Sequence, residues 1–181
     1  NLREVDFTGA DLTEAEAVGG DFSSGVFTGA RARKAIFSRS RMAGADWSEA
    51  RLEEAQLDGC DLSGANLKEA NLTGALLKGA VLVEAELGKA QLERANLSGA
   101  DLRNARLESA NLTGADLTGA NLLGANLTRA DLKDARLEPS QLKGAIFADA
   151  QVGQGIDVDS GEGDEPVELL IEDPSLAARG D

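Results

Sequence analysis

The stretch RARKAIFSRSR, residues 31–41, contains five basic residues and no acid, a composition that suits a phosphate- or nucleic-acid-binding patch. Several of these bases have an acid 20 positions away, as in the sets Glu14, Lys34 and Glu54; Arg33 and Glu53; and Asp21, Arg41 and Asp61. If segments at this separation are neighbours, each of these bases meets an acid. The sequence therefore favours a solvated charge ladder, whose exposed pairs each contribute little.

A second candidate lies near the C-terminus, where Asp157, Asp159 and Glu168 have the spacing of ligands in a calcium loop. That loop needs glycine at its sixth position for the sharp turn. Here Gly161 occupies the fifth position and Glu162 the sixth. We therefore predict no metal site.

The sequence also lacks the general base that nucleophilic catalysis usually requires. The chain has no His, the commonest general base and metal ligand. Ser40, Ser140 and the single cysteine, Cys60, stand at positions where most repeats carry Ala, so we interpret them as small buried residues. One cysteine excludes an internal disulfide or a cysteine zinc cluster. We predict no catalytic residue, no cofactor and no enzymatic activity.

One five-residue period organises the chain from Leu2 to Val152. Of the 31 positions in this phase, 21 are Leu, and all five Phe, the only Met and the only Trp belong to it. Of the 31 multiples of five from 5 to 155, 24 are Ala. The other three phases are polar, charged or Gly. We expect the Leu and Ala phases to be buried and the others exposed.

A period of five residues excludes an α-helix or a flat β-strand, because neither can bury every residue of the Leu phase. Five residues turn an α-helix about 140° past a full revolution, and an odd step reverses the face of a strand. A coil that turns a corner after each pentapeptide can point every Leu and Ala toward one axis. Short repeats of this kind are typical of solenoids.

The repeated phrase A(D/N)LXX, as in ANLTGADLTGANLLGANLTRADL over residues 110–132, resembles the pentapeptide-repeat family. The resemblance covers residues 1–155 and implies an all-β fold, a right-handed, four-sided parallel β-helix. Four sides of one pentapeptide each fit the separation of 20 positions between opposite charges, which supports this coil independently. About 7.5 coils spaced by about 4.8 Å would make a rod roughly 36 Å long.

The predicted core comprises the Leu phase. Phe7, Phe27 and Trp47 are separated by 20 positions each, so we expect one column of rings, and Ala32 leaves room beside it. The Leu-phase residue is the central residue of each pentapeptide. We expect Gly two positions after it to form the corner between one side of the coil and the next. The core residues singled out are Leu2, Phe7, Phe22, Phe27, Phe37, Met42, Trp47, Leu67, Leu97, Leu117 and Phe147.

Residues 156–181 abandon the period and form a separate acidic tail with nine acids and one base. Its first part has the composition of a flexible linker. Solenoid ends need covering, and the apolar residues Val167, Leu169, Leu170 and Ile171 are candidates for a cap or a dimer contact. A disordered tail is the alternative.

A rod with an apolar interior has surface but no cleft, so the first functional hypothesis is a rigid scaffold or interaction module for a protein partner, without nucleic-acid or membrane binding. Each side of the predicted coil is named after its first central residue, so the Phe7 face is the side that carries Phe7, Phe27, Trp47 and each twentieth residue beyond. The Phe7 face has a net charge of -3, whereas each other face has a net charge of -1. Asp6, Asp46 and Glu49 on it form the candidate partner surface. A homodimer through an end of the β-helix is a further candidate assembly, and a cytoplasmic location is expected.

The alternative hypothesis comes from the resemblance. Some pentapeptide-repeat proteins that protect against topoisomerase poisons resemble DNA in shape and charge and bind DNA gyrase or a related topoisomerase. The segment RMAGADW (residues 41–47) is similar to one in some of them. The net charge of -14 fits this alternative, but the tail contributes -8 of it. A mimic of DNA should concentrate its charge, whereas the repeats carry only -6, spread over four faces.

Overall fold

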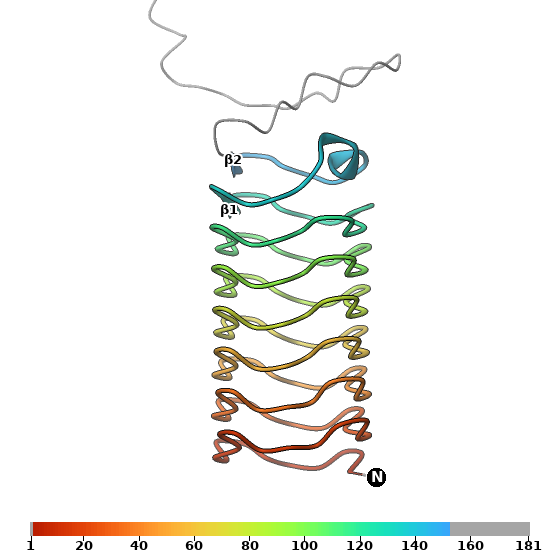
Figure 1. Cartoon of the computed structure of the whole chain (residues 1–181), viewed down its shortest axis with the longest axis vertical. Coiled ribbons are helices and arrows are strands. Elements are labelled where there is room, and N and C mark those ends of the chain that lie inside the picture. Colours follow the sequence, from red (N-terminus) through yellow and green to blue (C-terminus); the bar gives the residue numbers. More distant parts are fainter. Residues whose placement is uncertain (1, 153–181) are drawn as a thin grey trace, which may run out of the picture.

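The computed structural model describes residues 2–152, which form a rod of stacked coils with the N-terminus at one end (Figure 1). The 24 isolated bridges all join residues whose numbers differ by 20, in parallel, so each coil spans four pentapeptides. Two short strands, β1 (Asp131–Leu132) and β2 (Gln151–Val152), pair in the same register. The structure is therefore a parallel β-helix in which each side of a coil contributes one bridge residue.

The backbone of one pentapeptide, residues 96–100, shows how the coils are joined. The N–H of Asn96 donates to the coil before it, and the N–H groups of Leu97 and Gly99 donate to the coil after it. The N–H of Ala100 closes a turn onto the Leu97 carbonyl oxygen at 3.0 Å. Four of five amide groups are thus paired with backbone.

All corners but one use a left-handed residue two positions after the central residue. This position has positive φ in 13 glycines and in 16 other residues, from Glu4 to Asp149. Glycine adopts this conformation without strain, whereas at each other residue it costs roughly 1 kcal/mol or more. Glycine at these corners is therefore favourable but not required, because coil-to-coil bonding imposes the conformation.

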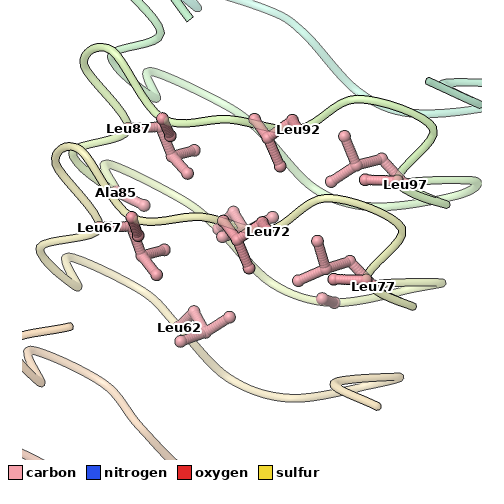
Figure 2. Packing of buried hydrophobic residues seen from close by; sticks show 14 of the residues in the cluster. Leu62, Leu67, Leu72, Leu77, Ala85, Leu87, Leu92 and Leu97 are labelled. Carbon is pink, nitrogen blue, oxygen red and sulfur yellow. The ribbon is translucent and has the colours of Figure 1, made fainter. Parts of the chain in front are cut away.

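The Leu and Ala phases fill the interior. Figure 2 shows Leu67 below Leu87 and Leu77 below Leu97, so identical side chains stack along the rod. From Phe22 to Leu132, every residue of the Leu phase is buried. Repeating the same shape at the same height lets successive layers pack without adjustment.

Aromatic rings replace leucine in the first three coils. The predicted column exists: the Phe7 and Phe27 ring centroids are 5.5 Å apart, and Phe27 stacks on Trp47 at 3.9 Å with 4° between the planes. Phe22 and Phe37 pack edge-on against each other at 5.7 Å. The rings therefore form a network inside the rod that extends beyond the predicted column.

The prediction that Leu2 is a core residue is wrong, because 46% of its surface is exposed. Phe7 is only partly buried. Both belong to the first coil, whose described neighbours lie on one side only. The remaining singled-out residues, Phe22, Phe27, Phe37, Met42, Trp47, Leu67, Leu97, Leu117 and Phe147, are buried.

One corner departs from the repeat. Pro139 occupies the corner phase, but its ring fixes φ near about -65°, so a left-handed corner cannot form there. The chain instead makes a 3-10 helix, η1 (Pro139–Leu142). The Gln141 side chain bridges the gap: its Nε2 donates to the carbonyl oxygens of Leu117 and Ala120 at 2.8 and 2.7 Å. The repeat is thus interrupted within the predicted β-helix.

Some predictions concern residues outside the described part of the chain. These are the cap or dimer contact of Val167, Leu169, Leu170 and Ile171, the calcium-loop residues Asp157, Asp159 and Glu168, and the whole tail, residues 156–181.

The phase assignment predicts different effects for the same substitution at two leucines. Leu97 is 1% exposed and Leu76 is 39% exposed. Leu97→Asp should destabilise by about 4 kcal/mol or more, because it buries an unpaired carboxylate. Leu76→Asp places Asp where the repeat already prefers it and should stay within about 0.5 kcal/mol. Urea unfolding measures both, and equal losses would contradict the assignment.

Candidate functional site

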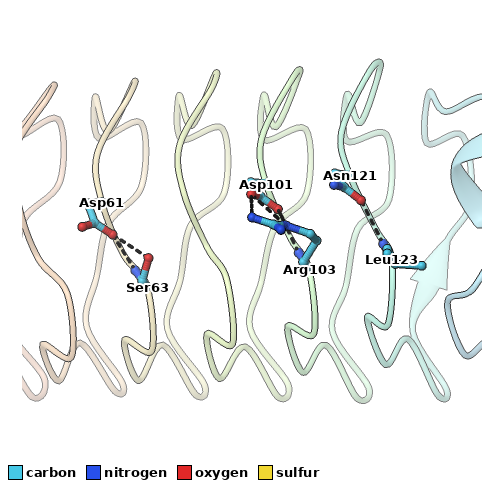
Figure 3. Close-up of polar contacts among 6 residues, drawn as sticks. All are labelled: Asp61, Ser63, Asp101, Arg103, Asn121 and Leu123. Atoms are coloured by element: carbon cyan, nitrogen blue, oxygen red, sulfur yellow. Dashed lines mark hydrogen bonds and ion pairs between the residues drawn. The ribbon is translucent and has the colours of Figure 1, made fainter.

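The outward-facing positions of the repeat are the part of the rod that can contact a partner. One of them, the position just before the central residue, also forms hydrogen bonds with the backbone. The fifth amide of each pentapeptide, just after the central residue, lacks a backbone acceptor in the pattern above. Figure 3 shows how it is satisfied: the Ser63 N–H donates to Asp61 Oδ1 at 3.1 Å, and the Leu123 N–H donates to Asn121 Oδ1 at 3.2 Å. The Asp or Asn before the central residue therefore caps the turn.

This contact recurs along the rod wherever the position before the central residue holds Asp or Asn. Among residues 2–152, all 14 Asp and Asn residues of this phase accept the N–H two residues later. In nine pentapeptides a Ser or Thr hydroxyl two residues later donates to the same oxygen. The (D/N) letter of the repeat is thus structural, although it faces outward.

The capping hydrogen bonds also lower the pKa values of aspartates that accept them. The hydroxyl of Thr8 and then its N–H donate to Asp6, and these hydrogen bonds lower the pKa of Asp6 below its usual 3.8. The Thr118 hydroxyl and N–H lower the pKa of Asp116 in the same way. Bonds to the charged form favour that form, so these aspartates remain ionised at neutral pH.

The candidate partner surface lies on the Phe7 face. Asp6 and Asp46 are both caps, and each uses Oδ1 for this purpose. Asp46 Oδ1 also accepts the Asn66 amide at 3.0 Å. Glu49 occupies a left-handed corner with φ 58° and is exposed. The structure therefore places the three acids on one side of the rod with different structural duties.

Sequence reasoning missed Val26, which lies between these acids. Bridges join Asp6 to Val26 and Val26 to Asp46, and Val26 is 37% exposed. The signal was available, because Val26 is one coil away from each aspartate in the sequence. The surface thus combines carboxylates with an exposed apolar side chain.

Ion pairs cross between coils as the charge ladder predicts. Arg41 Nη2 lies 2.9 Å from Asp21 Oδ2. Arg33, however, pairs with Glu54 at 3.0 Å and not with Glu53. Further pairs between adjacent coils are Arg31–Asp11, Lys34–Glu54, Lys89–Glu69, Arg106–Glu86 and Arg129–Asp149. Most of the basic stretch is therefore neutralised by neighbouring coils.

A second polar contact was not foreseen. Glutamate one position after the central residue accepts the side-chain amide of an Asn 18 positions later, in the pairs Glu53–Asn71, Glu93–Asn111 and Glu108–Asn126. This separation is that of a diagonal neighbour on the next coil. Asn in this phase can thus cap its own turn with oxygen and join the preceding coil with nitrogen.

The side chains of Ser40 and Cys60 have structural roles. Ser40 Oγ donates to the Ala17 carbonyl oxygen at 2.8 Å and accepts the Gly20 N–H at 3.0 Å. Cys60 Sγ donates to the Phe37 carbonyl oxygen at 3.0 Å, and burial raises the pKa of the thiol to about 11. A protonated buried thiol is a poor nucleophile. Ser140 lies in η1.

Among residues 2–152, no group of three or more acids and cysteines is arranged to hold a metal ion. No described helix has the length and apolar character to cross a membrane.

The fold and outward caps define a solenoid built from pentapeptides. The sequence model described as pentapeptide repeats matches in eight copies, over residues 1–29, 35–74, 60–99, 70–108 and 110–149. The chain therefore belongs to the pentapeptide-repeat family, whose members form right-handed β-helices.

Solved structures show the same architecture. A trypsin-treated variant of QnrB1, a plasmid-mediated fluoroquinolone resistance protein, is 24% identical, with a TM-score of 0.66 over 84% of this chain and 79% of that one. A pentapeptide repeat protein from the Arabidopsis thaliana thylakoid lumen is 34% identical, with a TM-score of 0.56 over 59% of this chain and 77% of that one. No curated protein matches the chain.

The cap predicts unequal effects of two substitutions at Asp116. Asp116→Ala leaves the Thr118 N–H without its acceptor and should cost about 1–2 kcal/mol at pH 7. Asp116→Asn keeps an acceptor oxygen in the same place and should recover most of that loss. Urea unfolding of both variants measures the difference, and equal losses would show that the side-chain oxygen does not hold the turn.

The dependence on pH serves as the control. Because folding lowers the pKa of Asp116 from 3.8, its stabilising effect is complete above about pH 4 and is lost as pH falls through the folded-state pKa. The Asn cap does not titrate, so Asp116→Asn should lose less stability than the parent protein on acidification. The same acid loss in both proteins would contradict the assignment.

Proposed function

We propose that this chain is a rigid, non-catalytic module that binds a protein partner through the Phe7 face. The observation that supports this most directly is the set of acids held in place by the coil backbone. Asp6 and Asp46 each use Oδ1 as a cap, and in the described structure Oδ2 accepts no hydrogen bond. Each aspartate thus keeps one carboxylate oxygen without a hydrogen bond, and Asp6 is exposed whereas Asp46 is half-buried.

The spacing of these groups defines the kind of partner. Asp6 and Asp46 are two coils apart, about 10 Å, and Val26 lies between them. The exposed Glu49 adds a third carboxylate at the neighbouring corner. A complementary surface carries two basic side chains with an apolar group between them. Because the caps hold the aspartates in place, little side-chain entropy is lost on binding.

Charge neutralisation tests the surface without disturbing the caps. In the triple variant Asp6→Asn, Asp46→Asn and Glu49→Gln, both Asn side chains keep the capping oxygen. We expect this variant to unfold like the parent protein but to capture partner proteins about tenfold less, because complementary charges are lost. Affinity capture on the immobilised full chain, with quantitative mass spectrometry, measures the change. Reversing Asp46 to a base is unsuitable, since this would also remove the cap.

The matched control removes the same number of charges elsewhere, with Asp61→Asn, Asp116→Asn and Glu84→Gln. This variant should retain partner capture. Equal capture by the parent protein and both variants would exclude the Phe7 face as the binding surface.

Mimicry of DNA is the second candidate function, since the fold is shared with a fluoroquinolone resistance protein. The charge of the repeats weighs against it: they carry -6 in total, and no face exceeds -3. A polyanion mimic needs a dense line of negative charge. The charges here are instead interrupted by bases from neighbouring coils, such as Arg41 beside Asp21.

We therefore expect purified protein at tens of micromolar to leave the supercoiling activity of DNA gyrase unchanged and to give no protection from a fluoroquinolone. An agarose-gel supercoiling assay, with a known gyrase inhibitor as positive control, measures both. Inhibition that disappears in the Phe7-face triple variant would instead assign gyrase as the partner of this same surface.

A further inference from the structure

One pair of side chains breaks the charge rule that the rest of the ladder obeys. Six isolated bridges join two charged residues, and in five an acid meets a base: Asp11–Arg31, Asp21–Arg41, Arg41–Asp61, Glu86–Arg106 and Asp116–Arg136. The sixth places Arg31 directly beside Arg51 on the next coil. Like charges on adjacent rungs, about 4.8 Å apart, are destabilising. A local conflict in an otherwise consistent pattern often marks a functional position.

The neighbouring acids neutralise this pair incompletely. Arg31 Nη2 contacts Asp11 Oδ2 at 2.9 Å. The closest approach of Arg51 to an acid is 4.0 Å, from Nε to Glu53 Oε1, and in the described structure its guanidinium donates no hydrogen bond. Arg51 therefore has a full set of unused donors next to a second arginine.

A third arginine completes a shallow hollow on this face. The hollow is lined by Thr13, Arg31, Arg33, Arg51 and Glu53. Arg33 gives one N–H to Glu54 and Arg31 gives one to Asp11, which leaves further N–H groups on both. Three arginines from two successive coils thus line one depression, and the guanidinium groups of Arg31 and Arg33 each also bond to an acid on an adjacent coil.

We propose that this hollow binds a single phosphate group. Guanidinium groups match the oxygens of a phosphate in paired hydrogen bonds, and a dianion between Arg31 and Arg51 would turn their repulsion into attraction. The acids limit the size of the ligand: Glu53 in the lining, with Asp11 and Glu54 beside the hollow, repels a long polyanion such as nucleic acid. A compact phosphate, either free or on the side chain of a partner protein, fits the charges.

The site is independent of the partner surface proposed above. Arg31, Arg33 and Arg51 belong to the face of Leu12, whereas Asp6, Asp46 and Glu49 lie on the adjacent Phe7 face. Loss of phosphate binding and loss of partner capture are therefore separable measurements.

Thermal unfolding of the full chain tests the site with inorganic phosphate, against chloride at equal ionic strength. We expect Tm to rise with the logarithm of the phosphate concentration above the dissociation constant, by about 3–6 °C at roughly ten times that constant. General salt effects of phosphate instead grow in proportion to its concentration. A purely linear rise, or none, would overturn the proposal.

The Arg51→Gln variant provides a second test, in which stability in chloride and stabilisation by phosphate should not fall together. Gln already occupies this phase at Gln56 and Gln91, so the fold should tolerate it. In chloride the variant should be as stable as the parent protein or more so, because the arginine repulsion is gone. It should also lose the logarithmic rise of Tm with phosphate concentration. A variant that keeps this response, or that is clearly less stable in chloride, contradicts the assignment.

Arg106→Gln is the matched control, since Arg106 is in the same phase but faces Glu86 at 2.9 Å. It should keep the full phosphate response, and its loss here would overturn the site. A short peptide with one phosphoserine, compared with its unphosphorylated twin, separates the two sources. A stronger response to the phosphopeptide than to phosphate assigns a partner-borne group, and an equal response assigns the phosphate alone. Tighter binding of a short DNA duplex than of phosphate would contradict a compact ligand.

Discussion

The left-handed corner that recurs after the central residues is the constraint on which the rest of this structure depends. It turns the chain once per pentapeptide, so each central side chain and each Ala point inward, and equivalent segments of successive coils meet in register. The turn leaves one amide without a backbone partner, and in 14 pentapeptides an outward Asp or Asn accepts its hydrogen bond. Core, coil pairing and caps are therefore consequences of a single conformational requirement repeated along the chain.

This dependence explains which residues can vary. Sixteen of the left-handed corners are not glycine, because two hydrogen bonds per pentapeptide to the next coil outweigh the strain of a left-handed residue. Proline is different, since its ring makes the conformation inaccessible. At Pro139 the chain gives up the corner, and the amide of Gln141 replaces the missing contacts. The corner position therefore accepts residues that are strained in the left-handed conformation, but it cannot form with proline.

The sequence was sufficient for the core and the coil because both depend on periodic positions. The Leu phase predicted the burial of residues such as Leu67, and the regular spacing of opposite charges predicted coil neighbours such as Asp21 and Arg41. The caps were not predicted, because a motif letter on a polar phase gives no sign that it bonds to its own backbone. The interruption at Pro139 could have been predicted, had positive φ been assigned to every corner and not only to glycines. The place of Leu2 could not, since burial at an end depends on what covers it.

The outward surface is less predictable, because sequence separation gives adjacency but not geometry. Arg33 was expected to meet Glu53 and reaches Glu54, since a long side chain can choose between adjacent carboxylates. Val26 escaped notice between two aspartates because an apolar residue in a polar phase carries no charge signal. The juxtaposition of Arg31 and Arg51 emerges only when the whole ladder is compared.

The constant length of the coil has a consequence for how such a chain changes in evolution. Loss or gain of one pentapeptide keeps every Leu and Ala in phase, so the interior survives. All residues beyond the change, however, move to the next side of the rod, and side chains that shared a face are parted or newly aligned. A change of one pentapeptide can therefore rearrange an entire set of surface constellations at once, whereas the gain of a whole coil only lengthens the rod.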